Sequence, residues 1–277
     1  MSRSSASTSD GWRLLVDAPA SGAWNMAVDE VLLDGVAAGT TPPTIRFYGW
    51  TPPCLSLGYF QPFDVVDVDG CRALGVDVVR RPTGGRAILH DRELTYSVAL
   101  PASVLGHDGG VLPSYYRLSL ALQDGLRRLG VPATVAPESA SSSAAHGPVC
   151  FDRPSAHEIL LHGRKLVGSA QMRRGSGLLQ HGSILIEPRI DKLMACLHRT
   201  DRAGSRGLEE AVAGLAELGV TDPGPIAAAI GAAFAKGFRV ALVEAPLRPD
   251  EEEAARALAR SKYQSTRWTE RLVPAIA

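Results

Sequence analysis

Residues 157–187 read HEILLHGRKLVGSAQMRRGSGLLQHGSILIE, and the pattern of this stretch decides the fold. Three runs rich in strand-forming residues lie at 157–161, 165–172 and 178–187, with glycine between them. Short apolar runs that alternate with glycine turns are typical of antiparallel strands joined by hairpins. The stretch therefore predicts an antiparallel meander.

Strand and helix signals surround this meander. Ser21 and Gly22 precede an apolar-periodic run and predict a capped helix over residues 23–38. Further strands are expected at 44–48, 54–59, 76–80, 86–90, 93–100 and 238–243, and further helices at 64–74, 113–129, 190–197, 207–218, 226–236 and 250–263. No repeat or linker divides the chain, so we expect a disordered Ser-rich tail at 1–10 and one domain over 11–277. The element order predicts an α+β fold with a mixed, largely antiparallel sheet flanked by helices.

The composition excludes several classes of protein. Lysine plus arginine equals aspartate plus glutamate at 29 each, so the bulk charge indicates neither a nucleic acid nor an anionic membrane as partner. No run reaches the roughly 18 apolar residues of a membrane span, and the N-terminus lacks the apolar segment of a secretory signal. The cysteines form no Cys-x-x-Cys pair, which argues against a zinc site or a disulfide framework: Cys54, Cys71, Cys150 and Cys196. A cytoplasmic protein with free thiols and no metal is expected.

Cys150 is the candidate nucleophile. It follows a loop at 137–148 that is rich in serine and alanine, and three residues that could lower its pKa come soon after it, namely Arg153, His157 and Lys165. A thiol needs such neighbours, because a free cysteine with a pKa near ~8.5 is only slightly ionised at neutral pH. The alternative is an inert buried thiol, which is what the strand and helix patterns predict for the other three cysteines.

Two further segments carry candidate binding residues, each with a plainer alternative. Gly84 and Gly85 allow a ligand to approach the backbone closely, and Arg80 and Arg81 could hold a phosphate or carboxylate. The alternative is an ordinary turn with solvated arginines. Lys165 could polarise an acyl carbonyl if it points inward, or it could be a solvated lysine.

Two histidines lie at the ends of expected strands. His90 precedes Asp91, and His181 precedes Gly182. On residue type and position, each is expected to be structural rather than a catalytic base, unless it lies next to Cys150.

Four ordered motifs resemble the biotin/lipoate protein ligase superfamily. They are WNMAVD at 24–29, RRPTGGRAILHD at 80–91, GRKLVGSAQ at 163–171 and QHGSI at 180–184. The resemblance covers residues from about 12 to 187. It implies the catalytic-domain fold of that superfamily, with Lys165 as its ligand-binding lysine.

Two departures distinguish the branches of that superfamily. Lipoate–protein ligases, which use ATP, typically have a third glycine in the first motif, where this chain has Arg86. Ligase-like octanoyltransferases carry a cysteine ahead of the lysine motif, and VCFD at 149–152 resembles that arrangement. The resemblance implies an octanoyltransferase of lipoate biosynthesis. Amidotransferases that shuttle octanoyl between carrier proteins are similar in chemistry. An ATP-dependent lipoate ligase and a non-catalytic carrier-protein-binding module remain as alternatives.

The resemblance also implies a mechanism. Cys150 would take the octanoyl group from octanoyl–acyl carrier protein as a thioester. The lysine of a lipoyl-domain protein, such as glycine cleavage H protein or a dehydrogenase E2 subunit, would then attack it. Lys165 would orient the acyl carbonyl, and no cofactor would be required. The residues expected at the acyl group are Arg81, Gly84, Gly85, Arg86, His90, Gly168 and Ala170.

Overall fold

The computed structural model describes residues 11–106, 110–138, 156–198 and 205–270. The predicted tail at 1–10 and the candidate nucleophile Cys150 lie outside these residues. Most of the Ser/Ala-rich loop at 137–148 also lies outside them.

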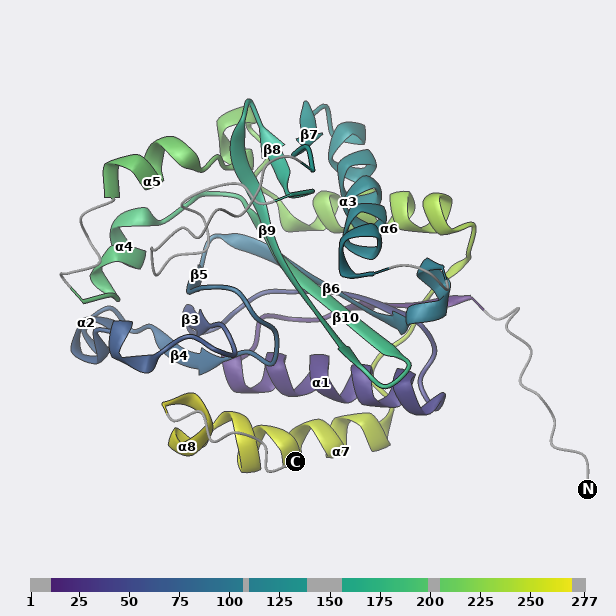
Figure 1. Cartoon of the computed structure of the whole chain (residues 1–277), viewed down its shortest axis with the longest axis horizontal. Coiled ribbons are helices and arrows are strands. Elements are labelled where there is room, and N and C mark those ends of the chain that lie inside the picture. Colours follow the sequence, from purple (N-terminus) through teal and green to yellow (C-terminus); the bar gives the residue numbers. More distant parts are fainter. Residues whose placement is uncertain (1–10, 107–109, 139–155, 199–204, 271–277) are drawn as a thin grey trace, which may run out of the picture.

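A mixed sheet forms the framework of the described chain (Figure 1). Its eight strands lie in the order β11 (Leu242–Glu244), β1 (Trp12–Val16), β2 (Thr44–Tyr48), β6 (Glu93–Pro101), β10 (Gly177–Leu185), β9 (Arg164–Arg174), β8 (Ile159–Leu161) and β7 (Ala133–Val135). Strand β1 is parallel to β11 and to β2, and every other neighbouring pair is antiparallel. The predicted meander is therefore confirmed as β8, β9 and β10, and the predicted mixed, largely antiparallel sheet is confirmed with it.

A small second sheet lies beside the first. It has the order β4 (Asp77–Arg80), β3 (Cys54–Leu57) and β5 (Ile88–His90), with β3 parallel to β4 and antiparallel to β5. Its apolar side packs against α2 (Val68–Ala73), α4 (Ile190–Ala195) and α5 (Ser205–Ala211) through a separate core cluster. The RRPTGG turn joins β4 to β5, so this sheet holds the turn in place.

Helices cover both faces of the large sheet (Figure 1). On one face, α3 (Val111–Arg128) and α6 (Pro223–Phe238) pack on the side chains of Leu94, Tyr96 and Val98 of β6. On the other face, α1 (Gly22–Ala38) and α7 (Pro249–Leu258) enclose a core that includes Ala99 of the same strand. Side chains alternate between the faces of a strand, which explains why consecutive residues of β6 enter different cores.

The remaining described elements are short. They are η1 (Phe63–Val65), η2 (Ala102–Leu105), η4 (Leu215–Leu218), the π-helical turn η5 (Ala259–Tyr263) and α8 (Thr266–Thr269). Within the residues that the structure describes, no helix combines the length and the apolar character needed to span a membrane.

Three predicted elements need correction. The helix expected at 64–74 is two elements, because the carboxylate of Asp67 accepts a hydrogen bond from the amide of Gly70 at 2.7 Å and so begins a new helix. The helix expected at 207–218 is divided into α5 and η4. The strand expected at 238–243 begins at Leu242, since Phe238 is the last residue of α6. Strands β1 and β7 and helix α8 were not predicted.

Candidate functional site

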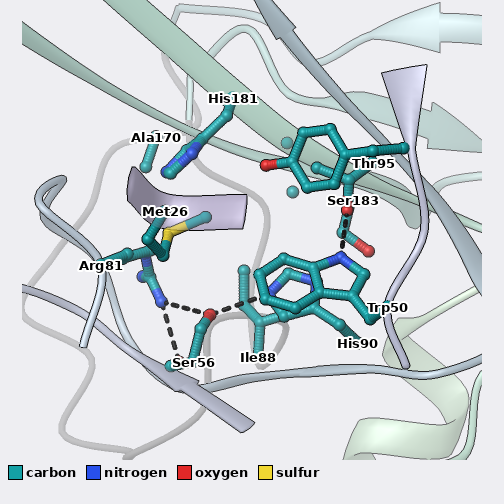
Figure 2. A pocket seen from close by; sticks show the side chains of 13 residues that line it. Met26, Trp50, Ser56, Arg81, Ile88, His90, Thr95, Ala170, His181 and Ser183 are labelled. Atoms are coloured by element: carbon teal, nitrogen blue, oxygen red, sulfur yellow. Dashed lines mark hydrogen bonds between the residues drawn. The ribbon is translucent and has the colours of Figure 1, made fainter. Parts of the chain in front are cut away.

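A pocket opens between α1, the central strands of the large sheet and the small sheet (Figure 2). The space between its lining atoms is about 290 Å³, including the part that is open to solvent. Its lining combines apolar, glycine and polar residues: Met26, Tyr48, Trp50, Ser56, Arg81, Ile88, His90, Thr95, Gly168, Ala170, His181, Gly182 and Ser183. A narrow, largely buried site with a few placed polar groups is typical of a small-molecule or acyl-chain site.

The structure brings together part of the predicted site. Four of the residues expected at the acyl group line the pocket, namely Arg81, His90, Gly168 and Ala170. Three others, Gly84, Gly85 and Arg86, belong to the adjacent turn and are not among its lining residues. Lys165 is on the same strand as Gly168 but does not line the pocket either.

Arg81 shapes the turn beside the pocket. It is only 3% exposed, and its guanidinium donates to the carbonyl oxygens of Gly84 at 2.9 Å, Arg86 at 2.7 Å and Ser56 at 2.9 Å. The alternative of solvated arginines is therefore wrong. The Arg81 donors that could have held a phosphate or carboxylate are directed at backbone carbonyls, so the arginine fixes the shape of the turn.

A buried acid that no sequence pattern predicted lies behind the pocket. Asp29 of α1 is fully buried and accepts a hydrogen bond from His181 Nδ1 at 3.0 Å. Its other donors are the guanidinium of Arg46, the hydroxyl of Tyr48 and the hydroxyl of Ser97, each at 2.9 Å. Burial by itself would raise the pKa of Asp29, but the hydrogen bond from His181 and the charge of Arg46 outweigh it, so the pKa is lowered. Asp29 is therefore ionised at neutral pH.

This ionised acid sets the proton position on His181. A carboxylate can only accept, so His181 donates from Nδ1. Its Nε2 lies 2.7 Å from the hydroxyl of Thr83 in the turn, within hydrogen-bond distance. The sequence suggested a structural histidine here. The structure shows a pocket-lining histidine, oriented by Asp29 and hydrogen-bonded to the turn.

A second histidine forms another wall of the pocket. His90 stacks on Trp50 with ring centroids 4.0 Å apart, and its Nε2 lies 2.8 Å from Ser56 Oγ. Trp50 in turn donates from Nε1 to Thr95 at 2.7 Å (Figure 2). Burial lowers the pKa of His90 more than nearby Glu93 raises it, so the imidazole is neutral at pH 7. The hydrogen bonds of His90 to Ser56 and of Trp50 to Thr95 hold the two stacked rings in place.

Lys165 is buried, and a β-bulge decides where it points. Leu166 and Val167 are consecutive, yet both pack into the core beneath α3 and α6, which regular alternation does not allow. The register of β8 and β9 shifts at this point, as a bulge requires. Lys165 consequently falls on the same face of β9 as Gly168 and Ala170.

The ammonium of Lys165 has a buried acidic partner. It is 1% exposed, and its Nζ donates to Glu158 Oε1 at 2.6 Å. The alternative of a solvated lysine is therefore wrong. A buried ion pair of this kind fixes the ammonium at one position on the pocket side of the sheet.

Three cysteines match the prediction of inert thiols. Cys54, Cys71 and Cys196 are free and buried. Burial raises the pKa of Cys54 well above its ordinary value, and the contact with Cys196 followed by burial raises that of Cys71. Neither thiol is a nucleophile at neutral pH.

Comparison with known families decides the classification. A family model described as the lipoyl protein ligase A/B catalytic domain matches residues 21–237. The chain belongs to this family. The superfamily that the four motifs indicated is therefore confirmed.

Curated relatives and solved structures agree with this placement. An octanoyltransferase LipM of Kyrpidia tusciae is 42% identical, over 94% of this chain and 98% of the relative. That of Carboxydothermus hydrogenoformans is 40% identical, over 93% and 97%. Protein Ta0514 of T. acidophilum, solved with bound lipoic acid, superposes with a TM-score of 0.78 at 26% identity, over 94% of this chain and 99% of that one. A lipoate-protein ligase A solved with ATP gives 0.79 at 26% identity, over 95% and 100%.

The family match covers the pocket but not all of the described chain. Every lining residue lies within 21–237, whereas β11, α7, η5 and α8 follow it. This C-terminal segment is nevertheless attached to the pocket region. Arg80 donates from Nε to the carbonyl oxygen of Thr269 at 3.1 Å, and Trp268 Nε1 donates to the carbonyl oxygen of Arg80 at 2.9 Å.

Proposed function

We propose that this chain is an octanoyltransferase that moves octanoyl from octanoyl–acyl carrier protein to the lysine of a lipoyl-domain protein. The observation that carries the proposal is its similarity, at 40–42% identity over 93–94% of the chain, to relatives named octanoyltransferase. The pocket supports it, since small residues such as Gly168 and Ala170 leave room for an acyl chain beside Met26 and Ile88. We further propose that residues 11–277 act as one catalytic domain.

The proposed reaction has two balanced steps. The Cys150 thiolate attacks the thioester carbonyl, a new C–S bond forms, the C–S bond to the carrier breaks, and the carrier leaves as a thiolate that takes up a proton from water. The ε-amine of the acceptor lysine then attacks the same carbonyl, an amide bond forms, and the Cys150 thiolate is released as the amine loses its proton. Exchange of a thioester for an amide is downhill, so the reaction requires neither ATP nor a metal.

Lys165 has two proposed tasks in this scheme. Its ammonium would stabilise the negative charge that develops on the acyl oxygen, and it would favour the ionised form of Cys150. The ion pair with Glu158 supports this role, because it holds the ammonium in place before the substrate arrives. Gly84, Gly85 and Arg86 would border the acyl group from the turn, while Arg81, His90, Gly168 and Ala170 would line its chain.

A second candidate function is ATP-dependent lipoate ligation, which the likeness to a ligase A solved with ATP favours. The two functions differ in what they consume. Purified chain should octanoylate a lipoyl-domain protein when given octanoyl–acyl carrier protein without ATP, and Cys150→Ser should lose this activity. If wild type modifies the acceptor only with free lipoate and ATP, and Cys150→Ser does the same, the chain is a ligase.

A further inference from the structure

Phe60 is an exposed aromatic residue held on a rigid loop. It is 81% exposed, more than any other large hydrophobic residue in the described part of the chain. Single exposed apolar side chains are common and need no explanation by themselves. What distinguishes Phe60 is the way its loop, residues 58–61, is fixed to the protein.

Arg80 fixes this loop from beneath. The residue is 1% exposed, and its Nη1 donates to the carbonyl oxygens of Gly58 at 2.8 Å, Tyr59 at 3.2 Å and Gln61 at 2.6 Å. The carbonyls on both sides of Phe60 are therefore bound to one planar, buried cation. The ring of Tyr59 supports Phe60 edge-on, with centroids 4.7 Å apart.

The same loop is packed against the turn that borders the pocket. The amide of Tyr59 donates to the carbonyl oxygen of Thr83 at 2.8 Å, and the Thr83 hydroxyl contacts pocket-lining His181. Gly58 lies so close to Gly85 that a Cβ atom added at Gly58 would be 1.8 Å from the carbonyl oxygen of Gly85. Phe60 is thus presented at a fixed position next to the site.

We propose that Phe60 is a docking anchor for the lipoyl-domain acceptor protein. This rests on the proposed function. An aromatic side chain on a preorganised loop binds a partner with little loss of conformational entropy, and such residues are enriched at interfaces. The acceptor is the partner that needs this surface, because its lysine has only a four-carbon stem. The acceptor's surface must lie against the enzyme beside the pocket, whereas a carrier protein delivers its acyl group on a long prosthetic arm.

The test compares the acceptor protein with a short peptide that contains the same lysine. With preformed octanoyl enzyme, Phe60→Ala should lower kcat/KM for the lipoyl-domain protein by about tenfold, as loss of an interface anchor does. Turnover of the peptide should stay within about twofold, because a short peptide lacks the folded surface that would cover Phe60 and the chemistry is intact. Phe60→Tyr should keep most of the activity. Leu218→Ala is the matched control, since Leu218 is 41% exposed on η4 and does not line the pocket.

Three results would overturn the proposal: an unchanged rate with the acceptor protein, an equal loss with the peptide, or a loss confined to acyl-enzyme formation from octanoyl–acyl carrier protein. A loss confined to acyl-enzyme formation would mean that Phe60 contacts the acyl carrier protein instead of the acceptor. Calorimetric titration of unacylated lipoyl-domain protein into wild type and Phe60→Ala separates docking from chemistry. Weaker binding by the variant supports the anchor even if the chain forms no octanoyl enzyme, and equal binding contradicts it.

Discussion

Asp29 and Glu30 are consecutive buried acids on α1 that serve different parts of the molecule. Successive residues of a helix point about 100° apart, so the two side chains meet different neighbours. Asp29 faces the sheet and orients His181 of the pocket. Glu30 faces the C-terminal segment, where it accepts hydrogen bonds from Lys262 Nζ at 2.7 Å and from the hydroxyl of Tyr263.

The contrast shows that a buried, ionised carboxylate does not by itself mark a functional site. Burial by itself would raise the pKa of both acids. Hydrogen-bond donors outweigh burial at each residue, chiefly His181 at Asp29 and Lys262 at Glu30, so both pKa values are lowered. The two acids differ in whether the residue that donates to them lines the pocket. His181 lines the pocket, whereas Lys262 and Tyr263 belong to η5, which follows the part of the chain that matches the family model.

Asp29→Asn should have the largest effect and should affect both stability and catalysis. The amide leaves Arg46 with less compensating charge, which should lower the free energy of unfolding by about 3 kcal/mol. His181 loses its fixed orientation, and we expect octanoyl transfer to fall by about 100-fold. Urea unfolding and transfer rates per folded molecule measure the two effects. A rate near that of wild type would contradict the role given to Asp29.

Glu30→Gln should affect stability alone. The change weakens charge-assisted hydrogen bonds and should cost about 2 kcal/mol in the free energy of unfolding. Among the residues that the structure describes, no partner of Glu30 lines the pocket. The value of kcat/KM should therefore remain within about twofold of wild type once the folded fraction is taken into account. If the transfer rate falls as far as it does in Asp29→Asn, the distinction between the two acids is wrong.

Acid should remove the difference between wild type and Glu30→Gln. The pKa of Glu30 is lower in the folded state than its ordinary value of 4.5. Its contribution to stability is therefore fully present above that value and is lost as the pH falls through the folded-state pKa. Thermal unfolding of both proteins from pH 7 downward should show a gap that stays constant to about pH 5 and then narrows. A gap that widens on acidification would contradict the lowered pKa.

Lys262→Met should have the smallest effect. Lys262 is 21% exposed, so solvent screens part of its interaction with Glu30, and Arg174 still donates to that carboxylate at 2.8 Å. We expect a loss of about 1 kcal/mol or less in urea unfolding, with unchanged transfer activity. A loss larger than that of Glu30→Gln would show that the C-terminal segment depends on Lys262 for more than this ion pair.

Local patterns predicted much of the fold. The glycine-separated runs at 157–187 became β8, β9 and β10, and the capped run became α1. The missed strands β1 and β7 are only five and three residues long, and each is stabilised by partners far away in the chain, such as β2 and β11 for β1. Such pairing has no signal within the segment itself.

The site was harder to predict than the fold. Motifs identified Arg81, His90, Gly168 and Ala170, all of which line the pocket. The network around Asp29 was missed because its donors come from three different strands, and charged residues in a sequence are normally expected at the surface. The inward direction of Lys165 depends on a bulge between β8 and β9, which residue spacing does not show.

The proposed reaction passes octanoyl through a thioester on Cys150, and this intermediate can be detected directly. Wild-type protein should be incubated with octanoyl–acyl carrier protein alone, then measured by intact mass and mapped after digestion. We expect one hydroxylamine-sensitive octanoyl group on the peptide that contains Cys150, and none in Cys150→Ser. The peptides that contain Cys54, Cys71 and Cys196 should be unmodified and serve as internal controls. An acceptor protein that becomes octanoylated while no adduct forms on Cys150 would contradict the claim.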